Sequence, residues 1–329
     1  MLTLALPAAA GLLLGCGSEE GNPPPAEPTT SPPLAEKPAG KVVRVGSEAE
    51  GVVVDPVTGL AAISFRDPNR IELVDVASGE VTAKVPTDDP ARHLSLAGPG
   101  GPVLAPIEFQ DQLLRIELPS GRVESTTTVG DFPHDATQAE NGRVFVGAEG
   151  GDVISVVDGE AVEVELPAPE QPGGVAYADG KVAVVAVAER VLSVIDAETL
   201  EELAELSAGA GPSHVVAGDD GRFYVTDTGG DALLVYEGEP EPRLVDRTNI
   251  SDSPYGIAID NERGRIWVTQ TARNRVVELE IADLAPRIIA DYPTVRQPNS
   301  VGVDERTGRV VVVGRDRGDV QIFQPEDER

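Results

Sequence analysis

Short apolar runs separated by polar turns fill the chain from residue 41 onward. The stretch 214–246 shows the pattern: an apolar run at 214–217, an Asp-Asp-Gly turn, a run at 222–227, a Thr-Gly-Gly-Asp loop, and further runs at 233–236 and 243–246. Val, Phe and Tyr favour strands, whereas Gly, Asp and Pro favour the turns between them. The pattern predicts four short antiparallel strands joined as a meander.

This unit recurs along the chain at nearly constant spacing. Its starting points lie 41, 43, 39, 40, 42 and 44 residues apart, at Ala49, Pro90, Pro133, Pro172, Pro212, Pro254 and Pro298. Turns with Pro and Gly every 8 to 12 residues exclude helical repeats of similar length. One such sheet cannot bury both of its faces alone, but a ring of sheets can. The sequence therefore predicts an all-β, seven-bladed β-propeller of four-stranded antiparallel blades over residues 41–329.

The two ends of the repeat region complement each other. The seventh unit supplies strand-like runs at 300–303, 310–314 and 320–323, and the sequence then ends at Arg329. It is one strand short. The run 41–45 precedes the first unit and has no other partner. We expect it to close the ring as the outermost strand of the last blade.

The first forty residues have a different character. Residues 1–15 are apolar and small and end in Leu-Leu-Gly before Cys16, which resembles the lipobox of bacterial lipoproteins. The resemblance implies a signal peptide over 1–15, a lipid on Cys16, and a protein held on the outer side of the cytoplasmic membrane by that lipid only. The alternative is an apolar stretch with an unmodified cysteine. Residues 16–40 carry seven prolines between 23 and 38 and predict an extended, solvated tether that reaches roughly 70 Å.

Composition narrows the choice of partners. The chain has 26 Lys and Arg against 56 Asp and Glu, a formal charge of −30, so it would repel the phosphates of nucleic acid. With Cys16 as its one cysteine, the chain forms no intrachain disulfide. We expect a monomer without a cofactor.

Several units share a recognisable motif. Residues 71–79, 192–199 and 223–227 resemble the repeats of YVTN-type propellers, and residues 254–258 with 265–269 are similar to NHL and streptogramin-lyase-type repeats. The resemblance covers residues 41–325 and implies the propeller fold. It implies no single function, because this fold hosts many activities.

The propeller fold predicts where a site should lie. First strands line the channel, and the turns that precede them share one face with the loops between second and third strands. The entry turns carry Asp135 and the loops carry Glu108, Glu149 and Asp227. Several other side chains there are cationic, so this face is expected to be locally positive and to bind an anion, a peptide carboxylate or a glycan. The predicted ligand-binding residues are Arg66, Arg92, His93, His134, Arg190, His214, Tyr255, Arg273, Asn299 and Arg315.

All three histidines of the chain fall in entry turns. If their nitrogens converged, His93, His134 and His214 would form a metal site. They lie at different offsets from the preceding proline, and neighbouring strand residues point to opposite sides, so structural and ligand-contact roles stay open.

Motifs of the common enzyme classes, such as a Gly-x-Ser-x-Gly elbow or a His-Glu-x-x-His pair, are absent from the sequence. We therefore expect a non-catalytic binding or scaffold module for a protein, a peptide or a cell-wall component. The alternative is a metal-assisted lyase or hydrolase of the streptogramin-lyase type, with His214 and Asp227 as the catalytic pair.

Overall fold

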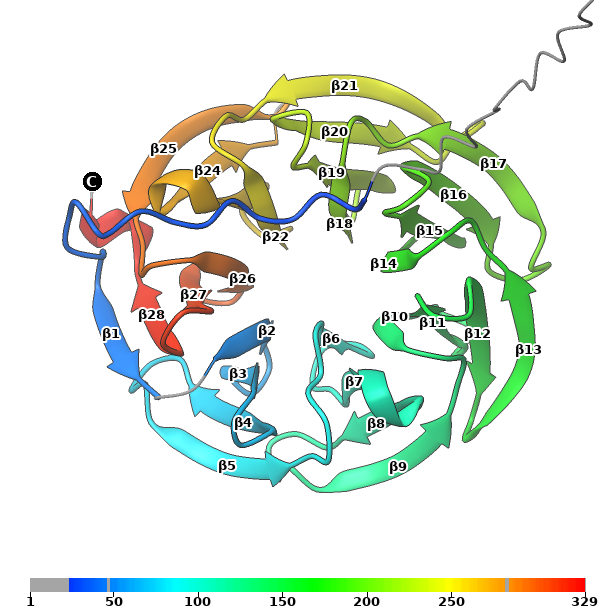
Figure 1. The fold of residues 1–329 in the computed structure, drawn as a ribbon, viewed down its shortest axis with the longest axis horizontal. Coiled ribbons are helices and arrows are strands. Elements are labelled where there is room, and N and C mark those ends of the chain that lie inside the picture. Colours follow the sequence, from blue (N-terminus) through cyan, green and yellow to red (C-terminus); the bar gives the residue numbers. More distant parts are fainter. Residues whose placement is uncertain (1–23, 46–47, 282–283, 329) are drawn as a thin grey trace, which may run out of the picture.

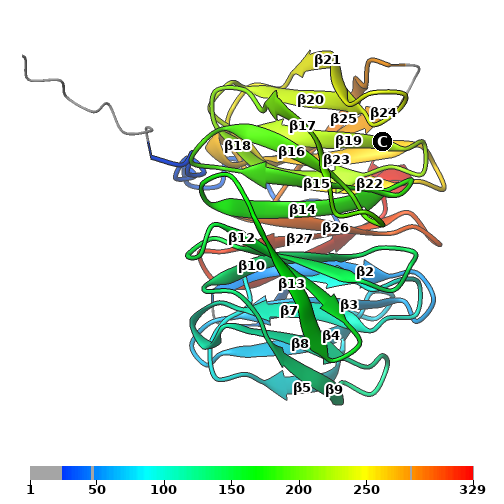
Figure 2. The ribbon, with the colours of Figure 1, turned by 90° about the vertical axis from the view of Figure 1, so that its right-hand side faces the viewer.

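Seven four-stranded antiparallel sheets form a ring around a central channel in the computed structural model, which describes residues 24–45, 48–281 and 284–328 (Figure 1). Seen from the side, the ring is a thick disc with the N-terminal segment on one face (Figure 2). The predicted seven-bladed propeller is confirmed.

The first four blades follow chain order from the channel outward. Blade 1 contains β2 (Ala49–Asp55), β3 (Leu60–Phe65), β4 (Arg70–Asp75) and β5 (Val81–Pro86). Blade 2 contains β6 (Ser95–Leu96), β7 (Val103–Ile107), β8 (Gln112–Ile116) and β9 (Val123–Thr128). Blade 3 contains β10 (Pro133–Gln138), β11 (Val144–Ala148), β12 (Val153–Asp158) and β13 (Ala161–Pro167). Blade 4 contains β14 (Pro172–Ala178), β15 (Lys181–Ala186), β16 (Val191–Asp196) and β17 (Glu202–Ser207).

The remaining blades complete the ring. Blade 5 contains β18 (Pro212–Ala217), β19 (Arg222–Asp227), β20 (Ala232–Glu237) and β21 (Arg243–Asn249). Blade 6 contains β22 (Pro254–Asp260), β23 (Arg265–Gln270), β24 (Arg275–Glu280) and β25 (Arg287–Pro293). Blade 7 contains β26 (Pro298–Asp304), β27 (Arg309–Gly314), β28 (Asp319–Phe323) and β1 (Lys41–Arg44). The described residues also form three short 3₁₀ helices, η1 (Glu108–Gln110), η2 (Thr271–Arg273) and η3 (Pro325–Glu328).

The core lies between the blades. Each cluster of buried apolar side chains in the described chain spans two neighbouring sheets, as where Phe145 and Ile154 of blade 3 meet Val182 and Val184 of blade 4. The middle strands are therefore covered on both faces: β3 and β15 are buried along their whole length, whereas the outer strands β13 and β17 alternate between exposed and half-buried residues. Many small Val side chains fill these flat interfaces, which explains why so few aromatic residues suffice.

Closure of the ring occurs as the sequence predicts. β1 pairs antiparallel with β28, with Lys41 opposite Ile322 and Val43 opposite Val320. Val45 packs against the apolar cluster between blades 7 and 1. The N-terminal strand thus supplies the outermost strand of the last blade and ties both ends of the repeat region together.

A register shift marks the start of the first strands. In blade 3, Pro133 pairs with Ala148 and Asp135 with Gly147, so one extra residue lies on β10. Blades 1, 4, 5, 6 and 7 have comparable shifts. Blade 2 departs most, because β6 is short and an isolated bridge from Ala91 to Ile107 precedes it. Such bulges re-aim neighbouring side chains.

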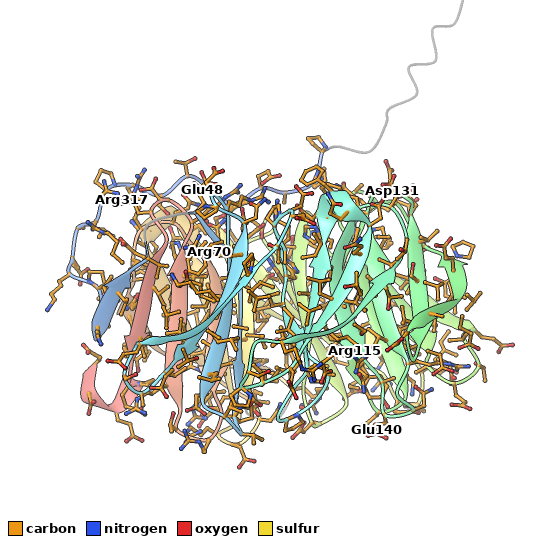
Figure 3. All side chains as sticks on the ribbon, turned by 90° about the horizontal axis from the view of Figure 1, so that it is seen from below. Glu48, Arg70, Arg115, Asp131, Glu140 and Arg317 are labelled. Atoms are coloured by element: carbon orange, nitrogen blue, oxygen red, sulfur yellow. The ribbon has the colours of Figure 1, made fainter. Side chains whose placement is uncertain are left out.

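Two faces of the disc are distinguished by their loops. The entry face carries the turns before the first strands and the loops between second and third strands; the opposite face carries the turns between first and second strands. Figure 3 shows Glu48, Asp131 and Arg317 on the entry face and Glu140 on the opposite face.

The N-terminal segment 24–38 crosses the entry face over blades 5 to 7, as the dark blue trace in Figure 1 shows. Ser31 and Ala39 are buried, and Ser31 is hydrogen-bonded to Thr271 and Gln297. Residues 24–39 are therefore docked on the disc, because polar loop groups bind their backbone, while most of their side chains stay in solvent. The predicted signal peptide and Cys16 lie outside the described residues. Among the helices that are described, none has the length and apolar character to cross a membrane.

Candidate functional site

The three histidines meet in the central channel. The ring centroid of His93 lies 4.7 Å from that of His134 and 4.6 Å from that of His214, and the ring of Tyr255 lies 4.6 Å from His214. Their different offsets from proline do not separate them, because the bulges at the strand entries turn neighbouring positions toward the axis.

Four side chains divide the channel in two. A larger chamber of about 440 Å³ and a smaller one of about 190 Å³ are both lined by Arg92, His93, His214 and Tyr255. We call these four residues the partition. The larger chamber extends from the partition toward the opposite face, where Asn261 and Glu305 line it.

Aliphatic side chains from every blade line the walls of the larger chamber. They include first-strand side chains that follow each entry turn, such as Val52, Val54, Val175, Val215, Ile257 and Val301. Near the partition, Asn299 and Ser300 add polar groups. The chamber therefore combines an apolar barrel with a polar inner end, as small-molecule sites commonly do.

Arginines from three blades converge on one buried carboxylate at the entry face. Glu50 Oε1 lies 2.5 Å from Arg66 Nε and 3.5 Å from Arg315 Nε, and Glu50 Oε2 lies 3.6 Å from Arg92 Nε. Arg66 and Arg92 also face Glu108, at 3.4 and 3.9 Å. The expected positive face is thus a network in which glutamates compensate the arginines, and it couples blades 7, 1 and 2.

The smaller chamber adjoins buried polar atoms without hydrogen-bond partners. His134 Nδ1 lies 3.3 Å from Glu108 Oε1 and 3.5 Å from Glu149 Oε2, yet His134 Nδ1 and Glu108 Oε1 make no hydrogen bond. Burial lowers the pKa of His134 well below its usual value, and the neighbouring His93 lowers it further. Burial raises the pKa of Glu149 to about 7, so this carboxyl can exchange a proton near neutral pH.

The other predicted ligand contacts separate into two groups. Asn299 lines the larger chamber. Arg66, Arg190, Arg273 and Arg315 line neither chamber. Arg273 is held on the surface by Asp252 and Asp291, and Arg190 lies in the loop of blade 4 with its Nε buried and unbonded.

Asp227 has a structural role in its own blade. Its Oδ1 accepts hydrogen bonds from the backbone N–H groups of Ala210, Gly211 and Gly230, at 3.0, 2.8 and 2.9 Å. Asp227 lines neither chamber, and the structure does not bring it together with His214 as the predicted catalytic pair. The same turn-stabilising role is seen for Asp55, whose carboxylate binds the backbone and hydroxyl of Thr58.

The histidine cluster does not have the geometry of a metal site. His93 and His214 stack with 22° between ring planes, so their in-plane nitrogens do not point to a common centre. Within residues 24–45, 48–281 and 284–328, no group of three or more His, Cys, Asp or Glu side chains is arranged to hold a metal ion.

Two parts of the site were not predicted from the sequence. Glu50 follows the first residue of its strand, the position that His134, Tyr255 and Asn299 occupy in other blades, and this alignment could have identified it. Pro25, Ala26 and Glu27 line the smaller chamber, and no sequence signal places them there.

Comparisons with known proteins identify the fold. No family model and no curated protein matches the chain. Among solved structures, hydrazine synthase of Kuenenia stuttgartiensis has a TM-score of 0.73 at 15% identity, covering 86% of this chain and 97% of that chain. Virginiamycin B lyase from Staphylococcus aureus has a TM-score of 0.68 at 16% identity, covering 85% of this chain and 97% of that chain. A chain of a mitotic checkpoint complex has a TM-score of 0.74 at 10% identity, covering 98% and 99%.

These similarities extend to unrelated functions, so they show the propeller fold alone. The likeness to streptogramin-lyase-type proteins is confirmed at the level of the fold. The YVTN-type assignment stays a prediction.

Proposed function

We propose that the protein is an envelope-anchored binding module whose ligand occupies the larger chamber and enters from the opposite face. The observation that carries this proposal is the chamber itself: a cavity of about 440 Å³ whose walls carry aliphatic side chains from every blade and that ends on the polar partition. Its size lies in the range typical of ligand sites. The ligand class that fits is a short peptide or comparable wall fragment, apolar along its body, with a polar group that reaches Arg92, Tyr255 and Asn299.

The direction of entry differs from the sequence prediction, which assigned binding to the entry face. That face is crossed by residues 24–38, and Pro25 to Glu27 line the smaller chamber. The larger chamber reaches the turns of the opposite face, among them Pro56, Pro99 and Glu305.

A thermal-shift screen of peptides and wall fragments tests this function. A ligand at one hundred times its Kd should stabilise the protein by about 2.7 kcal/mol. Ser300 is half-buried and lines the chamber, so Ser300→Phe should fill the space and abolish the shift, whereas Ser300→Ala should retain it. Equal shifts in both variants would show that the ligand binds elsewhere.

Anchoring is tested separately. If Cys16 carries the lipid, the wild-type chain should sediment with membranes and Cys16→Ser should be released. A wild-type chain recovered outside the membrane fraction would refute the anchor without affecting the chamber.

A second candidate function is proton-transfer catalysis in the smaller chamber. His134 Nδ1 lies 3.5 Å from Glu149 Oε2, the pKa of Glu149 is about 7, and structures named as streptogramin B and virginiamycin B lyases share the fold. This pair replaces His214 and Asp227 as the candidate acid and base. Turnover of a streptogramin B compound by the wild type, lost in Glu149→Gln, would support it; no turnover would reject it for this substrate class. The binding function is favoured because residues 25–27 cover this chamber.

A further inference from the structure

The best-defined contact between the N-terminal segment and the propeller is centred on Ser31. Its backbone N–H donates to Gln297 Oε1 at 2.8 Å, and its hydroxyl donates to the carbonyl of Thr271 at 2.5 Å. The backbone N–H of Gln297 donates to the Ser31 hydroxyl at 3.2 Å. Ser31 is 2% exposed, so its side chain fills a closed polar slot between blades 6 and 7.

Most contacts on both sides of this slot go to the main chain; the exception is Glu36, whose carboxylate pairs with Arg275 Nη1 at 3.0 Å. The N–H of Thr29 donates to Ser253 Oγ at 3.1 Å, and the Thr29 carbonyl accepts from Gln297 Nε2 at 3.2 Å. Asn274 Nδ2 donates to the carbonyl of Pro32 at 2.9 Å. Arg296 donates to the carbonyl of Ser31 through Nε and Nη2. The propeller therefore binds an extended backbone and selects one small hydroxyl side chain, which is how grooves recognise extended peptides.

The segment leaves most of its side chains in solvent. From residue 24 to residue 38, Ser31 is the one buried side chain, and residues 32–37 are exposed. Polar contacts rather than apolar burial hold it, so its release would expose little apolar surface. Pro32 and Pro33 restrict the backbone to extended conformations, which lowers the entropy lost on docking.

Docking of the segment also closes the smaller chamber. Pro25, Ala26 and Glu27 line this chamber opposite His134 and Glu149. Ala26 packs closely on blade 5, since a Cβ added to Gly211 would lie 2.6 Å from the Cβ of Ala26.

We propose that the entry face over blades 6 and 7 is a binding groove for an extended Ser-Pro peptide, which residues 24–38 occupy in cis. A partner peptide of the same chemistry competes with this segment, and displacement of the segment uncovers the smaller chamber. The groove is a second site, independent of the ligand in the larger chamber.

Hydrogen exchange on the full-length chain tests the cis contact. Ser31→Phe should be too large for the slot and should increase amide exchange at least tenfold at residues 29–31 and beside Asn274 and Gln297. Thr30→Phe is the matched control because Thr30 is exposed, and it should exchange like the wild type. Wild-type amides at 29–31 that exchange as fast as those of Ser31→Phe would overturn the proposal.

Binding in trans tests the groove. A fluorescent peptide of residues 26–36 should bind full-length Ser31→Phe at least tenfold more tightly than the wild type or Thr30→Phe, whose grooves are occupied. The same peptide with Phe in place of its serine should not bind. If the labelled peptide fails to bind Ser31→Phe while the exchange pattern of the blades is intact, the groove does not accept a partner and the proposal fails. A ligand of the larger chamber should give the same thermal shift in the wild type, Ser31→Phe and Thr30→Phe. Failure of the groove is therefore distinguishable from failure of the proposed function.

Discussion

The imidazole of His93 in blade 2 stacks on that of His214 in blade 5, with ring centroids 4.6 Å apart. Blades that are not neighbours in the ring thus touch across the axis. Burial lowers the pKa of His214 well below its usual value, and the adjacent His93 lowers it further, so His214 stays neutral at pH 7. Both rings belong to the partition, which lies between the two chambers.

Glu149→Gln should change the dependence of stability on pH. The pKa of Glu149 is raised to about 7 in the folded state, above its ordinary value of 4.5. The protonated carboxyl therefore contributes to the stability of the folded state at low pH, and this contribution is lost as the pH rises through 7. Relative to the wild type, the variant should gain about 2 kcal/mol in free energy of unfolding between pH 5 and pH 8. Urea unfolding at both pH values measures this. Glu140 is exposed on the opposite face, so Glu140→Gln should show no such gain. If the unfolding free energy of Glu149→Gln changed with pH as that of the wild type does, the raised pKa of the buried carboxyl would be contradicted.

Gly256→Ala should destabilise the ring between blades 6 and 7. An added Cβ would lie 2.5 Å from the carbonyl oxygen of Asn299, a backbone atom that cannot move without shifting β26. We expect a loss of about 3 kcal/mol in free energy of unfolding. Gly98→Ala is the control, since a Cβ there meets no atom within 4 Å. Similar stability of the two variants would be inconsistent with this close approach.

Val43→Pro should weaken the closure of the ring. In the antiparallel register, Val43 is opposite Val320, and the N–H of Val45 donates to Gly318. Because hydrogen-bonded pairs alternate, the N–H of Val43 also donates to β28. Proline removes this donor and should cost about 3 kcal/mol and lower the Tm by about 6 °C. Val43→Ala retains the N–H and should stay within about 2 °C of the wild type; an unchanged Tm in Val43→Pro would exclude closure through β1.

Asp227→Ala should lower stability and leave ligand binding in the larger chamber unchanged. Three backbone N–H groups would lose their acceptor, which should cost about 3 kcal/mol in thermal unfolding. Asp158→Ala, exposed at the end of β12, should change stability by less than about 0.5 kcal/mol. If Asp227→Ala instead kept its stability but lost activity in the streptogramin B assay, Asp227 would have the catalytic role that its contacts argue against.

The fold could be predicted because its signal is local and repeated. The prolines at 133, 172, 212, 254 and 298 each begin a first strand, where the missing N–H of proline is tolerated, and the missing strand of blade 7 indicated the partner for β1. Blade 2 shows the limit of this reasoning. Its first pairing is an isolated bridge at Ala91, and its first strand begins at Ser95 rather than at Pro90.

The site could be predicted only in part because it depends on contacts between blades. The histidines were identified as candidates, but whether they converge is decided by bulges that the sequence does not reveal. The cationic side chains of Arg66 and Arg92 suggested a positive face. Their ion pairs with Glu50 form only in the folded ring, where the loops of neighbouring blades meet. A proline-rich stretch has the composition of a free linker, and the polar loop groups of blades 6 and 7 that dock it cannot be read from that composition.

The docked segment 24–39 also determines how the disc would be oriented at a membrane. On the proposed anchor at Cys16, seven residues connect the lipid to Pro24, and they can extend at most about 25 Å. This is less than half the reach of an undocked tether. The entry face would then be held toward the bilayer, and the mouth of the larger chamber would open away from it, toward the cell wall.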